Sequence, residues 1–229
     1  LPGKSLYPLA RVPLIEHIIN RINSVADIDH IVLAVPDLPS ETNLIETAER
    51  LNVAIIKGPE EDVLKRFLMA ADHVKVQHIV RICGDNPLID RQLMRSLLHS
   101  HLEKNNDYTI ASDTIPLGTG TEVAKVDALK KIATITKEPK YREHVTTWFH
   151  DHPTTNIQSN VPAPVYLVNK PYRLTIDTES DLSLMEKIFQ KFCTATSLLP
   201  DLAKVIDFLD THPEIANINA NIQQKNWRS

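Results

Sequence analysis

The sequence predicts an α/β fold, a three-layer sandwich in which helices cover a mainly parallel β-sheet. Short apolar runs, typical of strands buried on both faces, alternate with segments whose apolar residues recur at helical spacing. Polar residues directly follow several of these runs. Regular alternation of strand and helix indicates βαβ units, and such units pair their strands in parallel.

The first helix is predicted after Pro13, because Leu14, Ile18 and Ile22 recur at helical spacing and proline suits a first helical turn. A buried strand at 31–35 follows and is ended by Pro36. The alternation continues with helices at 41–51, 60–71 and 88–102, and with strands at 53–56, 79–82 and 108–111. Asp90 is a candidate N-cap for the helix at 88–102.

The pattern changes after Gly120. We expect a strand at 122–126, helices at 128–135 and 142–150, and an edge strand at 156–161. A strand at 173–176, a helix at 181–192 and two short helices around Pro213 complete the chain. No segment has the composition of a linker between domains, so residues 1–229 are predicted to form a single domain.

Composition excludes several classes of protein. The chain has only five glycines in 229 residues, against a usual ~7%, and none of them can form a glycine-rich dinucleotide-binding turn or a P-loop. A net charge of −4 without a long basic run indicates no nucleic-acid partner. No apolar run reaches the ~18 residues of a membrane span, and two distant cysteines are typical of reduced thiols. We therefore expect a cytoplasmic protein without a membrane or nucleic-acid partner.

Two aspartates stand where an α/β protein binds its ligands, beyond the carboxyl ends of the strands. Asp85 follows the strand at 79–82, and Asp177 follows the strand at 173–176. Two carboxylates at one sheet edge suit Mg²⁺, which completes its shell with water and substrate phosphates. Each aspartate alone is equally well explained as the cap of the next helix, but the pair favours a metal site.

Lys4 precedes the first predicted helix. Its ammonium group could neutralise phosphate oxygens, although residue type alone favours an ordinary surface lysine.

Five segments, taken in order, resemble one family, the cytidylyltransferases of spore-coat polysaccharide biosynthesis, which are related to the CMP-sialate and CMP-KDO synthetases. The resemblance covers essentially the whole chain. Its segments are Leu-Pro-Gly-Lys at 1–4, Gly-Pro-Glu-Glu-Asp-Val-Leu-Lys-Arg at 58–66, Arg-Ile-Cys-Gly-Asp-Asn-Pro-Leu-Ile-Asp at 81–90, Arg-Glu-His-Val-Thr at 142–146, and Arg-Leu-Thr-Ile-Asp-Thr at 173–178.

The resemblance implies a nucleotide-diphospho-sugar transferase fold. It also implies transfer of CMP from CTP to an acidic or otherwise modified sugar, with Mg²⁺ and with release of pyrophosphate. Lys4 would hold the triphosphate as a catalytic residue. Asp85 and Asp177 would bind the metal ion, which polarises the α-phosphate and neutralises the leaving group.

Further residues are assigned to substrate binding by the same resemblance. Those near the nucleotide are Arg66, Arg81, Asn86 and Arg173, and those of the acceptor-sugar pocket are Glu122, Arg142, Glu143 and His144. Alternatives remain open for several of them. Arg66 is equally well placed for an ion pair with Asp62 at i, i+4, Arg81 for pairing with an acidic neighbour, and His144 for a structural role.

Members of the family open with a strand and a loop carrying Gln-Ala-Arg before Leu-Pro-x-Lys, so this chain is expected to begin inside a longer domain. Cys83 stands at a position where members of the family often have threonine. Gly120 replaces a frequent acidic residue, which affects the choice of sugar. The region near 120–164 is expected to form a homodimer interface by analogy with the related synthetases. The alternatives are a glycosyltransferase or another sugar nucleotidyltransferase of this fold, and a non-catalytic binding subunit.

Overall fold

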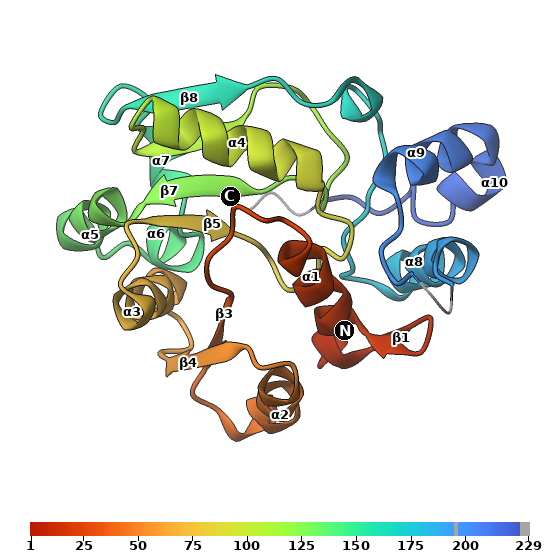
Figure 1. The fold of residues 1–229 in the computed structure, drawn as a ribbon, viewed down its shortest axis with the longest axis horizontal. Coiled ribbons are helices and arrows are strands. Elements are labelled where there is room, and N and C mark those ends of the chain that lie inside the picture. The colour runs from red at the N-terminus through yellow and green to blue at the C-terminus, as the bar shows by residue number, and fades with distance from the viewer. Residues whose placement is uncertain (195–196, 225–229) are drawn as a thin grey trace.

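The predicted alternation of strands and helices is present in the computed structural model, which describes residues 1–194 and 197–224 (Figure 1). The chain starts with a short 3-10 helix, Lys4–Leu6, and a small antiparallel hairpin that is not predicted from the sequence. The hairpin joins β1 (Pro8–Leu9) to β2 (Val12–Pro13) through Ala10 and Arg11, both at positive φ. It lacks the glycine or asparagine that signals such a turn.

The first parallel unit follows helix α1 (Leu14–Asn23). Strand β3 (Val32–Pro36) pairs in parallel with β4 (Ala54–Gly58), and α2 (Thr42–Arg50) connects them. Helix α3 (Val63–Val74) then leads into the second sheet. Each of these elements falls within a few residues of its predicted position.

The second sheet has the order β5-β7-β6-β8. Strand β7 lies antiparallel between β5 and β6, whereas β6 and β8 are parallel. This sheet is therefore mixed, whereas the sequence predicts mainly parallel strands. The reason is that β7 follows a long segment after β6 and runs antiparallel to both of its neighbours. The strands are β5 (His78–Arg81), β6 (Tyr108–Ala111), β7 (Glu122–Lys125) and β8 (Gln158–Val161), and helix α4 (Arg91–Glu103) connects β5 to β6.

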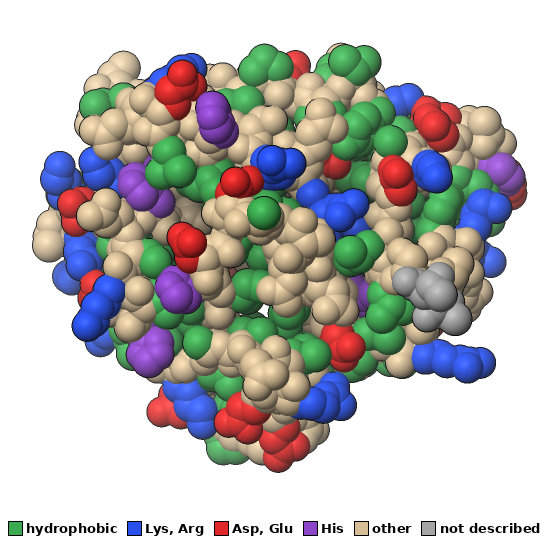
Figure 2. All heavy atoms as spheres, in the orientation of Figure 1, with side chains coloured by type: hydrophobic (Ala, Val, Ile, Leu, Met, Phe, Trp, Pro, Cys, Tyr) green, Lys and Arg blue, Asp and Glu red, His purple; other side chains and the backbone are tan. Residues whose placement is uncertain are grey.

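The two sheets are not hydrogen-bonded to each other in the described residues, and a cavity of about 990 Å³ lies between β3 and β5. Its walls are mainly apolar and include side chains of α1 and α3. Figure 2 shows hydrophobic side chains bordering an opening at the middle of the molecule. The same two helices contribute to the cores that hold the sheets in place.

Beyond β7, the helix predicted at 142–150 is divided in two. Helix α6 (Pro139–Glu143) and helix α7 (Thr147–Asp151) are separated at His144, whose φ of −104° and ψ of 66° are not helical. The remaining helices are α5 (Val126–Ile135), α8 (Glu179–Phe192), α9 (Leu202–Thr211) and α10 (Pro213–Ala216), and a 3-10 turn spans Val165–Leu167.

The strand predicted at 173–176 is an extended segment rather than a ladder strand. Arg173 makes an isolated parallel bridge with Leu117, and the Leu174 amide donates to the Leu117 carbonyl at 2.7 Å. Gly118 permits this close approach, because it has a φ of 91° and an added Cβ would lie 2.3 Å from the Leu174 carbonyl oxygen. The segment is thereby fixed against the loop that precedes β7.

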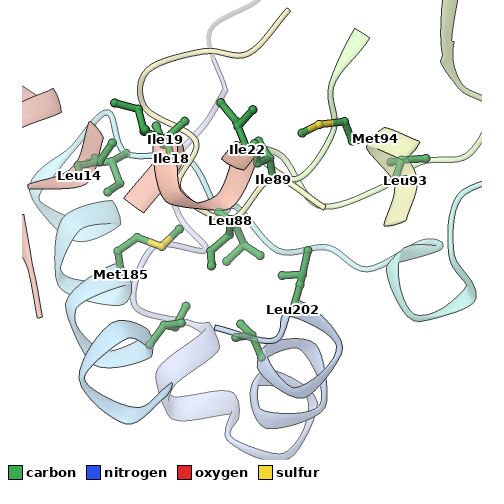
Figure 3. Packing of buried hydrophobic residues seen from close by; sticks show 14 of the residues in the cluster. Leu14, Ile18, Ile19, Ile22, Leu88, Ile89, Leu93, Met94, Met185 and Leu202 are labelled. Atoms are coloured by element: carbon green, nitrogen blue, oxygen red, sulfur yellow. The ribbon is translucent and has the colours of Figure 1, made fainter. Parts of the chain in front are cut away.

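Two hydrophobic cores support this arrangement. The larger is formed by α1, the start of α4, α8 and α9, with Leu14, Leu88 and Met185 fully buried among its residues (Figure 3). The smaller lies between β6, β7, α5 and α7 and includes Tyr108 stacked on Phe149. Burial of apolar surface in these cores favours the folded state by ~25 cal/mol per Å².

No helix within residues 1–194 and 197–224 combines the length and the hydrophobicity needed to cross a bilayer.

Candidate active site

The two aspartates singled out by the sequence come together. Asp85 lies in the loop after β5, and Asp177 ends the extended segment that follows Arg173. The amide of Ile176 donates to the Asp85 carbonyl at 3.0 Å, so the backbones of the two segments are joined one residue before Asp177. Neither carboxylate caps a helix, since α4 is capped by Asp90 and α8 by Thr178. The capping alternative is therefore wrong for both.

The ammonium group of Lys4 lies between these carboxylates. Lys4 Nζ is 2.8 Å from Asp85 Oδ2 and 2.6 Å from Asp177 Oδ1. Partial burial disfavours the charged ammonium, but hydrogen bonds to Asp177 and Asp85 outweigh it and raise the pKa of Lys4. Lys4 is thus a charged member of the cluster, not an ordinary surface lysine.

The donor set of this cluster suits a hard divalent cation. Two carboxylates already share one positively charged group, and both remain partly exposed, with 23% and 39% of their side-chain surface accessible. In the described part of the chain, no three His, Cys, Asp or Glu side chains converge as a complete metal cage. A magnesium ion bound here would therefore take most of its ligands from water and substrate, as Mg²⁺ commonly does.

Arg173 lies behind Asp177. Its Nη2 donates to Asp177 Oδ2 at 2.5 Å and its Nε donates to Asp181 Oδ1 at 2.9 Å. Asp181 is fully buried and completes a capping box with Thr178 at the start of α8. Asp181 is not among the residues predicted from the sequence, although a threonine followed three residues later by an aspartate is a capping signal.

A second polar cluster surrounds Glu122 at the start of β7. Its carboxylate accepts hydrogen bonds from Arg81 at 2.7 Å, from Thr146 at 2.9 Å and from the hydroxyl of Tyr108, and it lies 3.4 Å from His150 Nε2. Burial opposes the charge, but contacts with His150, Arg81 and Tyr108 lower the pKa of Glu122 to about 2. The alternative in which Arg81 pairs with an acidic neighbour is confirmed, and its contact with a nucleotide stays a prediction.

The Glu122 cluster joins β5, β6, β7 and α7. Its other members were not singled out from the sequence, because Tyr108, Thr146 and His150 meet Glu122 only through tertiary packing. The contact of Glu122 with an acceptor sugar stays a prediction.

Arg142, Glu143 and His144 occupy α6 and its end. Arg142 is mostly buried and bonds Asp62 Oδ2 through Nη2 at 2.5 Å and through Nε at 3.0 Å, while Glu143 is exposed. This ion pair ties α6 to the N-terminus of α3, because Asp62 also caps that helix through the Lys65 amide. The three residues do not contact Lys4, Asp85 or Asp177 in the described hydrogen bonds and ion pairs, so their place in a sugar pocket stays a prediction.

Arg66 does not form the i, i+4 ion pair with Asp62. Its Nη1 instead donates to the carbonyls of Pro59 and Glu60, the latter at 2.7 Å, and holds the loop between β4 and α3. Buried Arg66 Nε and Asn86 Oδ1 have no hydrogen-bond partner in the described residues. Asn86 directly follows Asp85, so its buried acceptor is a candidate contact for a ligand at the aspartate pair.

Comparison with known proteins shows which proteins the chain is similar to. Residues 1–199 match the family model described as cytidylyltransferase. The chain is 34% identical over 228 residues to the uncharacterized protein MJ1063 of Methanocaldococcus jannaschii, covering 100% of this chain and 92% of that protein. It is 32% identical over 223 residues to the spore coat polysaccharide biosynthesis protein SpsF of Bacillus subtilis, covering 94% of this chain and 91% of that protein.

Solved structures share the fold. A cytidylyltransferase from Leptospira borgpetersenii aligns with a TM-score of 0.88 at 22% identity, covering 99% of this chain and 93% of that one. A CMP:2-keto-3-deoxy-manno-octonic acid synthetase complexed with CTP aligns with a TM-score of 0.61 at 15% identity, covering 83% and 93%. A Mycobacterium tuberculosis protein, Rv0371c, in complex with manganese aligns with a TM-score of 0.57 at 12% identity, covering 80% and 91%. The predicted fold class is therefore confirmed.

Proposed function

Because the chain belongs to the cytidylyltransferase family, whose members are CTP-dependent nucleotidyltransferases, we propose that it transfers CMP from CTP to an acidic sugar and releases pyrophosphate for surface polysaccharide biosynthesis. We further propose that Mg²⁺ is the metal ion and that Asp85 and Asp177 bind it. The observation that carries the proposal is the convergence of Lys4, Asp85 and Asp177 from three separate segments of the chain.

The reaction requires a sugar hydroxyl to attack the α-phosphorus of CTP as the bond to pyrophosphate breaks. Lys4 would bind phosphate oxygens, exchanging its contacts with the carboxylates for contacts with the triphosphate. Asp85 and Asp177 would hold Mg²⁺, which when bound supplies positive charge to the α-phosphate and the leaving group. Asn86 would offer its buried acceptor beside Asp85. These residues position the substrates and neutralise charge, which are the main requirements of phosphoryl-type transfer.

An acidic acceptor is proposed because the expected sugar pocket includes Arg142 and His144, and an arginine and a histidine suit a carboxylate-bearing sugar. Arg142 is held in an ion pair with Asp62, so binding a sugar carboxylate would require it to share its guanidinium group. Glu143 is exposed and available for a sugar hydroxyl. Cytoplasmic location is part of the proposal, because CTP is supplied there.

A screen of four nucleoside triphosphates tests the proposal. The protein would be incubated with Mg²⁺, each nucleotide, and either a sugar acid or its neutral counterpart, and the products identified by mass spectrometry. The proposal predicts a CMP-sugar and pyrophosphate with CTP and a sugar acid alone. A product that forms only with UTP, or consumption of a nucleotide sugar, would instead support another nucleotidyltransferase or a glycosyltransferase of this fold.

A homodimer is the expected assembly, with the segment near 120–164 at its interface. Ile135 and Ile157 lie in that segment and are 62% and 60% exposed, so both are candidate apolar contacts of the interface. Light scattering after size exclusion should give twice the 25.9 kDa chain mass at micromolar concentration. A mass equal to one chain would refute the dimer.

A further inference from the structure

Asp181 is a buried carboxylate with an unusually complete set of hydrogen bonds. It is 0% exposed. Its Oδ2 accepts from the amides of Asp177 and Thr178 at 3.0 and 2.9 Å and from the Thr178 hydroxyl at 3.0 Å. Its Oδ1 accepts from Arg173 Nε at 2.9 Å and from Asn219 Nδ2 at 2.7 Å. The hydrogen bonds from these partners offset the cost of burying the charge, and Arg173 is the charged partner among them.

Arg173 connects this buried carboxylate to the active-site cluster. Its side chain is 11% exposed and its guanidinium group reaches Asp177 Oδ2 at 2.5 Å and Asp181 Oδ1 at 2.9 Å. Asp177 therefore uses one oxygen for Arg173, while its other oxygen is 2.6 Å from Lys4 Nζ. The orientation of the Asp177 carboxylate depends on where Arg173 is held.

The charges of these residues also balance. A guanidinium group beside Asp177 would by itself neutralise that carboxylate and weaken its attraction for a cation. Asp181 supplies a compensating negative charge on the other side of Arg173, and its hydrogen bond to the Asp177 amide fixes the backbone at the same point. Partners of this kind orient a metal-binding carboxylate and set its charge.

We propose that Asp181 is a positioning residue, which holds Arg173 and the Asp177 backbone so that Asp177 presents Oδ1 to the cation and phosphates of the active site. This role rests on the proposed function of Asp177 in metal binding. It goes beyond the capping box of α8, because a helix cap requires the amides and hydroxyl of Thr178 but does not require Arg173.

Direct binding of Mn²⁺, measured by electron paramagnetic resonance with and without CTP, separates positioning from capping. Asp181→Asn retains an oxygen acceptor for the cap but removes the charge that faces Arg173, and it should weaken Mn²⁺ binding about tenfold or more. Thr178→Val removes the capping hydroxyl and leaves the Arg173 contact intact. It should lower the melting temperature without changing Mn²⁺ affinity.

Asp201→Asn is the matched control, because Asp201 caps α9 through the Lys204 amide and has no arginine partner in the described hydrogen bonds. It should leave Mn²⁺ affinity unchanged. If Asp181→Asn fails to fold, Arg173→Lys is tested in its place. An ammonium group cannot contact Asp177 and Asp181 at the same time as a guanidinium group does, so a similar loss of Mn²⁺ affinity is expected.

Wild-type Mn²⁺ affinity in folded Asp181→Asn, or in Arg173→Lys, would overturn the positioning role. So would an equal loss of affinity in Thr178→Val. Failure of the proposed function would look different, because the wild-type protein would then bind Mn²⁺ no better than Asp85→Asn, with or without CTP.

Discussion

The ammonium group of Lys4 lies where two carboxylates meet, at 2.8 and 2.6 Å from Asp85 and Asp177. In this position the lysine competes with any divalent cation for the same oxygens. A triphosphate gives the ammonium an alternative partner and leaves the carboxylates to the metal. Nucleotide and metal should therefore bind with positive cooperativity.

Substitution of Lys4 tests this competition. Lys4→Met should bind free Mn²⁺ about tenfold more tightly than wild type, a difference of ~1.4 kcal/mol, because a competing positive charge is removed. The same variant should bind CTP more weakly, since a phosphate contact is lost. Isothermal titration measures both affinities. Lys130→Met removes an exposed lysine from an ion pair with Asp72 and should change neither. Weaker Mn²⁺ binding by Lys4→Met would contradict the competition.

At the scale of elements, Glu122 joins three strands and a helix. Its carboxylate is 15% exposed and contacts Arg81 of β5, Tyr108 of β6, and Thr146 and His150 at α7. Because its partners come from separate segments, the cluster fixes β7 between its neighbours. Removal of the charge should affect stability more than removal of any exposed ion pair.

Glu122→Gln should lower the free energy of unfolding by ~3 kcal/mol at pH 7, because Arg81, whose side chain is only 23% exposed, is left without its charged partner. The pKa of Glu122 in the folded protein is about 2, below its ordinary value of 4.5, so its contribution to stability is present above pH 4.5 and is lost as pH falls through 2. The difference in the free energy of unfolding between Glu122→Gln and wild type should therefore be smaller at acidic pH. Urea unfolding at pH 7 and at pH 3 measures it, with the exposed Asp72→Asn as control. A difference that does not narrow at pH 3 would contradict the assigned pKa shift.

At the scale of the whole molecule, the candidate site draws on segments far apart in the chain. Lys4 comes from the N-terminal turn, Asp85 from the loop after β5, and Asp177 from the segment before α8. A ligand that binds all three residues joins three segments that are far apart in the chain. Binding should therefore stabilise the molecule as a whole.

CTP with Mg²⁺ should raise the melting temperature by about 5–10 °C at one hundred times the dissociation constant, because that saturation contributes ~2.7 kcal/mol of stability. CTP with a chelator should raise the melting temperature less, and UTP with Mg²⁺ should raise it less than either. Differential scanning fluorimetry records all three. No shift with CTP and Mg²⁺ would favour a non-catalytic binding subunit.

The sequence predicts what depends on local pattern. The cap of α4 at Asp90, the positions of most helices and the two aspartates beyond strand ends all follow from spacing and order along the chain. Arg142 and Asp62 are separated by 80 positions, so their ion pair depends on how α6 packs against α3 and could not be predicted. For Arg66 the local pattern is misleading. Its i, i+4 spacing from Asp62 favours an ion pair, but in the structure its guanidinium group donates to two loop carbonyls instead.

The measurement that tests the central claim most directly is the rate of pyrophosphate release from CTP in the presence of Mg²⁺ and the acceptor sugar, compared between wild type, Asp85→Asn and Asp177→Asn. The role of these carboxylates predicts that each variant folds with a melting temperature near that of wild type and loses at least ~1,000-fold in rate, as expected when charge stabilisation in the transition state is removed. A rate within tenfold of wild type in either folded variant would contradict it.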